Sequence, residues 1–170
     1  DMPTLDTIAG LVTIAGQPFN VADGAAFTLT GDTVHSDINN DGVLLLRDNS
    51  STLNGLVTNT GTFSLESYIN ANVFVTINSL FTNQGLITFD NVYDAGARNE
   101  TLIAVGGLAN EGTVRSMQSA GGGTQRIDGD FVNASGGVLD VDHTLTIRGI
   151  NIDLSSGTVD VASGQELLLQ

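Results

Sequence analysis

The residues from Asp37 to Gly42 have the types and spacing of the first half of a Ca²⁺-binding loop. Oxygen-bearing side chains occur at Asp37, Asn39 and Asp41, Gly42 stands in the sixth place, and Asp48 supplies an acid in the twelfth. Ca²⁺ takes carboxylate and amide oxygens as ligands, and Gly allows the sharp turn around the ion. The competing interpretation is a plain chain corner, because the Val-Leu-Leu-Leu run after Gly42 is typical of a strand. We therefore expect no cofactor, with Ca²⁺ as the open alternative.

A second candidate group consists of Asp140, Asp142 and Asp160, which alternate along two expected strands. Carboxylates on neighbouring strands can raise one another's pKa and work as an acid–base pair on a glycan. A site that cleaves an acidic glycan also needs cations, and the chain has only five Arg and no Lys. The two histidines, His35 and His143, lie far apart in the sequence. We expect the protein not to be an enzyme.

Three Asn-x-Ser/Thr sequons are present, and each could accept an N-linked glycan in a host with that pathway. They begin at Asn49, Asn99 and Asn133. A chain this rich in Asn, Ser and Thr produces such triplets by chance, so chance occurrence is the alternative.

The elements that must position these residues are set by a repeated seven-residue pattern: apolar, any, Asn, any, Gly, any, apolar. Clear copies are Phe-Thr-Asn-Gln-Gly-Leu-Ile from Phe81 and Leu-Ala-Asn-Glu-Gly-Thr-Val from Leu108. Successive copies are separated by twenty-odd residues, which is the length of one coil of a parallel β-helix. Short alternating runs follow each Gly, so each coil reads as two or three strands.

The Asn and Gly of the pattern are expected to occupy coil corners. Stacked corners place each Asn above the next, so their amides can form a hydrogen-bonded ladder as in cross-β stacks. Gly at a corner would supply the positive φ that a sharp bend needs. The expected ladder is Asn40, Asn59, Asn83, Asn110 and Asn133; the expected corner glycines are Gly42, Gly61, Gly85, Gly112, Gly137 and Gly157.

The fold prediction is therefore an all-β protein, a single parallel β-helix (β-solenoid) of about seven coils. We assign residues 1–170 to one domain, with less regular N-terminal coils over 1–37 and the Asn-Gly repeat coils over 38–170. The repeat pattern resembles that of secreted prokaryotic β-solenoid surface proteins, which include filamentous-haemagglutinin-like adhesins and autotransporter passenger domains. That resemblance implies an extracellular or cell-surface rod with an adhesive or structural role, and it transfers no catalytic residues.

Composition narrows the function classes. The formal net charge is −14, from 19 acidic and five basic residues. Such a surface lacks the cations that neutralise phosphates, so we expect neither nucleic-acid binding nor docking on anionic membranes. No apolar run is long enough to span a membrane, and Cys is absent, which excludes disulfides.

The last residues, Glu166 to Gln170, are strand-like and have no visible cap. Either the chain is a fragment of a longer solenoid, or its open coil end pairs with another copy, and head-to-tail contacts of this kind generate fibres. The leading hypothesis is therefore a non-enzymatic extracellular structural protein, a subunit of a self-assembling surface filament, sheath or adhesin, with other copies of itself or cell-surface glycans as partners. The alternative is a carbohydrate-binding or carbohydrate-cleaving β-helix.

Overall fold

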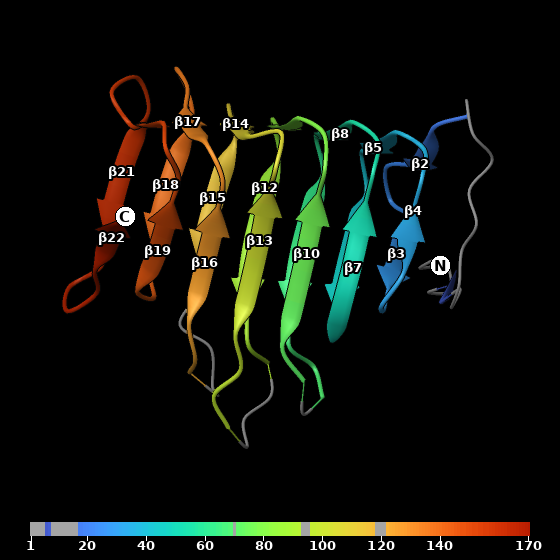
Figure 1. Ribbon diagram of the computed structural model, residues 1–170, viewed down its shortest axis with the longest axis horizontal. Helices are drawn as coiled ribbons and strands as arrows, with labels where there is room; N and C mark the ends of the chain where they lie inside the picture. Colours follow the sequence, from blue (N-terminus) through green and yellow to red (C-terminus); the bar gives the residue numbers. More distant parts are fainter. Residues whose placement is uncertain (1–5, 8–16, 70, 93–95, 118–121) are drawn as a thin grey trace.

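The protein is an all-β solenoid in a computed structural model that describes residues 6–7, 17–69, 71–92, 96–117 and 122–170. No helix occurs in these ranges, so none there is long and apolar enough to cross a membrane. The coil axis runs along the long dimension of the molecule, with the described N-terminal strands and the C-terminus at opposite ends (Figure 1).

The strands of the described residues form three parallel sheets. Sheet A comprises β1 (Asp6–Thr7), β3 (Ala26–Leu29), β6 (Val43–Arg47), β9 (Thr62–Glu66), β12 (Leu86–Asp90), β15 (Thr113–Ser116), β18 (Val138–Val141) and β21 (Thr158–Val161). Sheet B comprises β2 (Phe19–Val21), β5 (Ile38–Asn40), β8 (Val57–Asn59), β11 (Phe81–Asn83), β14 (Leu108–Asn110), β17 (Phe131–Asn133) and β20 (Ile152–Asp153). Sheet C comprises β4 (Thr33–Val34), β7 (Asn49–Leu53), β10 (Val73–Ile77), β13 (Glu100–Ala104), β16 (Gln125–Asp128), β19 (Leu145–Arg148) and β22 (Leu167–Leu169).

Each coil visits sheet B, then sheet A, then sheet C, and the next coil repeats this order (Figure 1). Apart from the first and last strand of each sheet, every strand pairs in parallel with the equivalent strands of the coils before and after it, as β9 does with β6 and β12. The prediction of a parallel β-solenoid is thereby confirmed. Within the N-terminal region 1–37, β2, β3 and β4 already join the three sheets, whereas residues 1–5 and 8–16 lie outside the described part.

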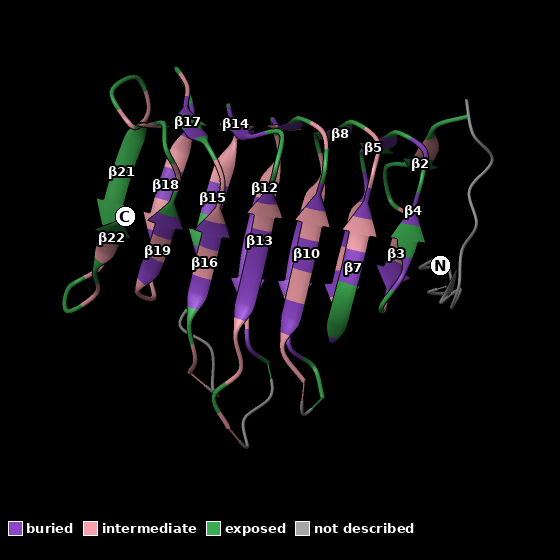
Figure 2. Ribbon diagram, viewed as in Figure 1, coloured by how far each residue is buried: buried purple, intermediate pink, exposed green. Residues whose placement is uncertain are grey.

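The core is a set of apolar columns that run along the axis, one residue per coil. Alternation sends one side of each strand inward, as in β10, where Val73, Val75 and Ile77 are buried. Phenylalanines are the largest of the fully buried side chains, and the Phe63 and Phe81 rings pack with centroids 4.9 Å apart. Figure 2 shows the buried strands in the middle of the stack. Burial of this continuous apolar interior is the main stabilising term.

The three corners of the coil differ in length, and this decides where loops accumulate. Only Asp48 separates β6 from β7, and Asp48 and Asn49 have left-handed φ values of 42° and 67°, a conformation that Asp and Asn tolerate. On the next three coils the same A-to-C corner is enlarged by the connections 67–72, 91–99 and 117–124. The described parts of these connections lie together along one side of the rod (Figure 1, bottom).

Candidate functional site

The five asparagines of the repeat form one buried column at the end of the sheet B strands. Each is the last residue of its strand and is in register with the next, as Asn59 is with Asn83 and Asn83 with Asn110. The Nδ2 group of each of the first four donates to the Oδ1 of the asparagine on the following coil, at 2.6 to 2.8 Å. Four of the five have no exposed surface, and Asn40 is 1% exposed. The members are Asn40, Asn59, Asn83, Asn110 and Asn133.

The same amide groups also hold the B-to-A corner together. The Nδ2 group of Asn83 donates to the carbonyl of Thr113, which begins the sheet A strand of the following coil, at 3.1 Å, and the other column members make the equivalent bond. A side-chain amide can be buried without penalty when both of its N–H groups donate hydrogen bonds. The column stops at Asn40, whose Oδ1 has no partner because its in-register neighbour is Val21.

The corner glycines are required for a different reason from the one expected. None of Gly42, Gly61, Gly85, Gly112, Gly137 and Gly157 has a positive φ; in the fifth copy the positive φ, 90°, belongs to Gly136. Instead, a Cβ at each of the six positions would lie closer than 3.0 Å to atoms of the preceding coil or of the corner itself. At Gly61, Gly85 and Gly112 the obstacle is the backbone of the glycine corner below. The prediction of positive φ was wrong, and close stacking of the corners is the physical reason for Gly.

The four candidate Ca²⁺ ligands are distributed around one coil. Asp37 precedes β5 at the C-to-B corner, Asp41 lies at the B-to-A corner, and Asp48 lies at the A-to-C corner. Each aspartate accepts hydrogen bonds from the next coil: Asp37 from the Leu56 N–H, Asp41 from the Thr60 hydroxyl, and Asp48 from two backbone N–H groups at 3.0 and 2.9 Å. The strand after Gly42 carries the chain away, so the acid at the twelfth position does not approach the first.

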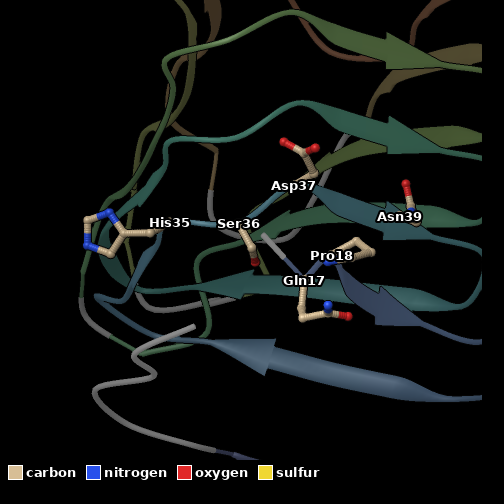
Figure 3. A pocket seen from close by; sticks show the side chains of 6 residues that line it. All are labelled: Gln17, Pro18, His35, Ser36, Asp37 and Asn39. Carbon is tan, nitrogen blue, oxygen red and sulfur yellow. The ribbon is translucent and has the colours of Figure 1, made fainter. Parts of the chain in front are cut away.

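Two of these ligand candidates share a shallow polar pocket near the N-terminal end. Asp37 and Asn39 line it together with Gln17, Pro18, His35 and Ser36 (Figure 3). The amide of Asn39 is bonded to the Oδ1 of Asn20, at 2.9 Å. In the described part of the chain no group of three or more His, Asp or Glu residues is arranged to hold a metal ion.

The three sequons occupy different environments. Asn49 is exposed, at the start of β7. Asn99 is partly exposed, and its Oδ1 accepts from the N–H and hydroxyl of Thr124. Asn133 is fully buried in the asparagine column, where Asn110 donates to its Oδ1. A glycan cannot be accommodated at Asn133 in the folded chain, so that glycosylation candidate is corrected.

The aspartates considered for glycan chemistry lie on the outer face of sheet A. Asp140 is in register with Arg115 on one side and with Asp160 on the other. Arg115 is paired with Asp140 at 3.2 Å and with Asp142 at 2.5 Å. One guanidinium thus compensates two carboxylates, an arrangement typical of a structural ion pair on a strand surface. The histidines are not part of this group: His35 adjoins Asn54, and His143 adjoins the Gly123 carbonyl.

A buried polar group that the sequence analysis did not single out lies inside the enlarged A-to-C corner. It comprises Ser67, Glu100 and Gln125, and none of the three is more than 2% exposed. The Ser67 hydroxyl donates to Glu100 Oε1 at 2.6 Å. Burial raises the pKa of Glu100 from 4.5 to about 7, and nearby Asp90 contributes in the same direction. In the structure Glu100 alternates with the buried Leu102 and Ala104 and so lies on the inward side of β13.

Comparison with known proteins gives no relative for this chain. No family model, curated protein or solved structure matches it. The fold and the contacts above are therefore the basis for every functional statement that follows.

Proposed function

We propose that this protein is a non-enzymatic structural β-solenoid whose copies stack end to end into a filament, sheath or adhesive rod outside the cell. The repeat pattern of its sequence is similar to that of secreted prokaryotic β-solenoid surface proteins. Three features support the proposal: the in-register coils, the buried asparagine column and the strongly acidic composition. A stack of this kind extends by adding coils, since each coil offers free strand edges in all three sheets to the next.

The observation that carries the proposal is the in-register parallel stacking of equivalent coils, and the proposed contact is the apolar face of the coil formed by β20, β21 and β22. Val159, Val161 and Leu169 continue the inward columns of Leu139, Val141 and Ile147. The side chains of these inward columns on the preceding coil are 0% exposed, whereas Val159, Val161 and Leu169 are 38%, 39% and 51% exposed. Figure 2 shows β21 as an exposed strand at the end of the stack. Covering this face would remove apolar surface from water, which favours association.

The proposed occupant of this face is a second copy of the chain. Its coils have the same three-sheet cross-section, so its strands can continue the parallel ladders of β20, β21 and β22. Contacts of this type are heterologous, and they lead to open filaments rather than closed rings.

The test compares two lysine substitutions at valines of equal exposure. Val161→Lys places a charge on the apolar coil face, whereas Val132→Lys places it on the lateral face of sheet B, where Val132 is 42% exposed. We expect the parent protein and Val132→Lys to form higher-order assemblies as concentration rises, and Val161→Lys to remain monomeric. Light scattering and negative-stain imaging report the result. A monodisperse parent monomer at high concentration, or equal loss of assembly in both variants, would overturn the proposal.

A further inference from the structure

Glu100 and Gln125 are adjacent polar side chains inside the solenoid, between the apolar Val73 and Leu145 of the same column. Each is the first residue of its strand, β13 and β16, and the two are in register on neighbouring coils. The residue in register with Glu100 on the other side is Val73, which is 1% exposed. Glu100 is 0% and Gln125 is 2% exposed, so neither side chain is solvated.

Two oxygen atoms in this pair have no hydrogen-bond donor among the described residues. Gln125 Nε2 donates to the carbonyls of Phe89 and Met117, at 3.2 and 3.1 Å, so both of its hydrogens are engaged. Glu100 Oε1 accepts from Ser67. Glu100 Oε2 and Gln125 Oε1 are left buried without a partner. Glu100 and Gln125 are in register on neighbouring strands, and two buried acceptors without a proton to share destabilise such a site.

We propose that Glu100 is protonated in the folded protein at mildly acidic to neutral pH, that its Oε2–H donates to Gln125 Oε1, and that loss of this proton to water loosens the enlarged A-to-C corner. A single proton satisfies both acceptors and removes the buried charge. The corner thereby becomes a pH-sensitive latch that holds three loops on successive coils.

The surrounding charges favour the neutral carboxyl. Burial is the largest cause of the raised pKa of Glu100, about 7, and the Asp90 carboxylate at the end of β12 adds to it, whereas the hydrogen bond from Ser67 opposes it. The cations of the packed elements are engaged elsewhere: Arg47 with Glu66, Arg126 with Asp128, and Arg98 Nη1 with the Ala97 carbonyl. Asp48, at the same corner one coil earlier, accepts the N–H groups of Tyr68 and Ile69.

Hydrogen bonds connect the latch directly to two of the loops and, through Asn91, to the third. Ser67 begins the connection 67–72, and the two carbonyls that accept from Gln125 belong to Phe89 in β12 and to Met117 at the start of 117–124. Asn91, itself fully buried, donates to the carbonyls of Gly96 and Gly122 and so ties 91–99 to 117–124. Exposed apolar side chains, Tyr68 and Ile69 at 56% and Val92 at 41%, lie on these loops. Ionisation of Glu100 therefore acts on a surface that presents apolar side chains.

The direction of the pH dependence follows from the raised pKa. Between pH 4.5, the ordinary value, and about 7, the folded protein holds a proton that the unfolded chain has lost. The contribution of Glu100 to stability is fully present below pH 4.5 and is lost as pH rises through about 7. One proton changes the unfolding equilibrium constant by at most about tenfold per pH unit.

The first experiment measures urea unfolding of the full chain from pH 5 to pH 8.5 for the parent, Glu100→Gln and Glu111→Gln. Glutamine at position 100 can donate its Nε2–H to Gln125 Oε1 and still accept from Ser67, so it imitates the protonated acid. Glu111 is an exposed control, bonded to Gln84. Between pH 5 and 8 we expect the unfolding equilibrium constant of the parent and of Glu111→Gln to rise roughly tenfold or more. The unfolding constant of Glu100→Gln should lack this rise. An identical slope in parent and Glu100→Gln overturns the proposal.

A second experiment uses only the parent protein. It therefore tests the proposal even if Glu100→Gln folds poorly. ¹³C labelling of the glutamate carboxyls, Glu66, Glu100, Glu111 and Glu166, follows each titration by NMR. One carboxyl titrating near pH 7 supports the proposal; all four titrating near 4.5 overturn it. Amide-exchange protection in the loops should fall from pH 6 to pH 8 in the parent, and unchanged protection of Ser67 and Met117 would refute the latch.

Discussion

At the scale of single residues, the asparagine column replaces solvent with a chain of amides. Asn83 stands in the middle: it accepts from Asn59 and donates to Asn110, both at 2.7 Å. A side chain at this depth cannot exchange its partners for water, so a missing member leaves two buried polar groups unsatisfied. Neighbouring members also hold each other's orientation, which strengthens the ladder as a unit.

The substitution Asn83→Ala tests this directly. It removes the hydrogen-bond partners of the Asn59 side-chain Nδ2 and of the Asn110 side-chain Oδ1. We therefore expect a loss of about 2–4 kcal/mol in the free energy of unfolding. The control is Asn39→Ala, at an exposed asparagine bonded to Asn20, where a change below about 0.5 kcal/mol is expected. Urea denaturation measures both. Equal effects of the two substitutions would contradict a stabilising role for burial of the column.

At the scale of elements, strand and corner positions were predictable where the sequence repeats, and not where it departs from the repeat. The Asn-Gly spacing placed the column members correctly at the ends of the sheet B strands, because one coil returns the chain to the same corner. The same spacing could not distinguish a need for positive φ from a need for close approach at Gly61 and Gly85. A glycine that is required for its backbone conformation and a glycine that is required for close contact between coils look the same in the sequence.

The enlarged A-to-C corner shows the second limit of sequence reasoning. Nine residues, 91–99, separate Asp90 from Glu100, and a loop of that length breaks the phase of the alternating pattern. Without a known phase, Glu100 reads as a surface acid, since acids are seldom buried. The Ca²⁺ pattern fails for the related reason that Asp37, Asp41 and Asp48 are close in sequence but lie at three separate corners.

The close approach of coils at the B-to-A corner gives a prediction for Gly85→Ala. A Cβ there would meet the backbone of Thr60 and Gly61 on the preceding coil, so strands β11 and β12 have to shift. We expect a loss of about 2–3 kcal/mol in unfolding free energy, the range of an overpacked interior. Gly96→Ala is the matched control, because its Cβ would meet only the flexible Arg98 side chain, at 3.5 Å or more. Thermal unfolding of the two variants distinguishes them; similar stability would show that the corner can relax.

At the scale of the whole molecule, the acidic surface and the apolar coil face act in opposite directions on assembly. The formal net charge is −14, and exposed acids of the last coil, Asp153, Asp160 and Glu166, surround the apolar face. Copies that stack would bring like charges together, and like charges repel over a range set by the ionic strength. Removal of apolar surface from water is insensitive to that screening. The balance between the two terms therefore depends on salt.

Salt is thus expected to promote assembly of the parent protein. The screening length shortens from about 30 Å at 0.01 M to about 8 Å at 0.15 M, so repulsion between copies weakens while the apolar contact persists. The concentration at which light scattering detects assemblies should fall over this range, and Val161→Lys should remain monomeric throughout because its buried lysine stays costly. If association were driven by ion pairs between copies instead, added salt would dissociate the assemblies. That opposite trend would rule out the coil face as the main source of cohesion.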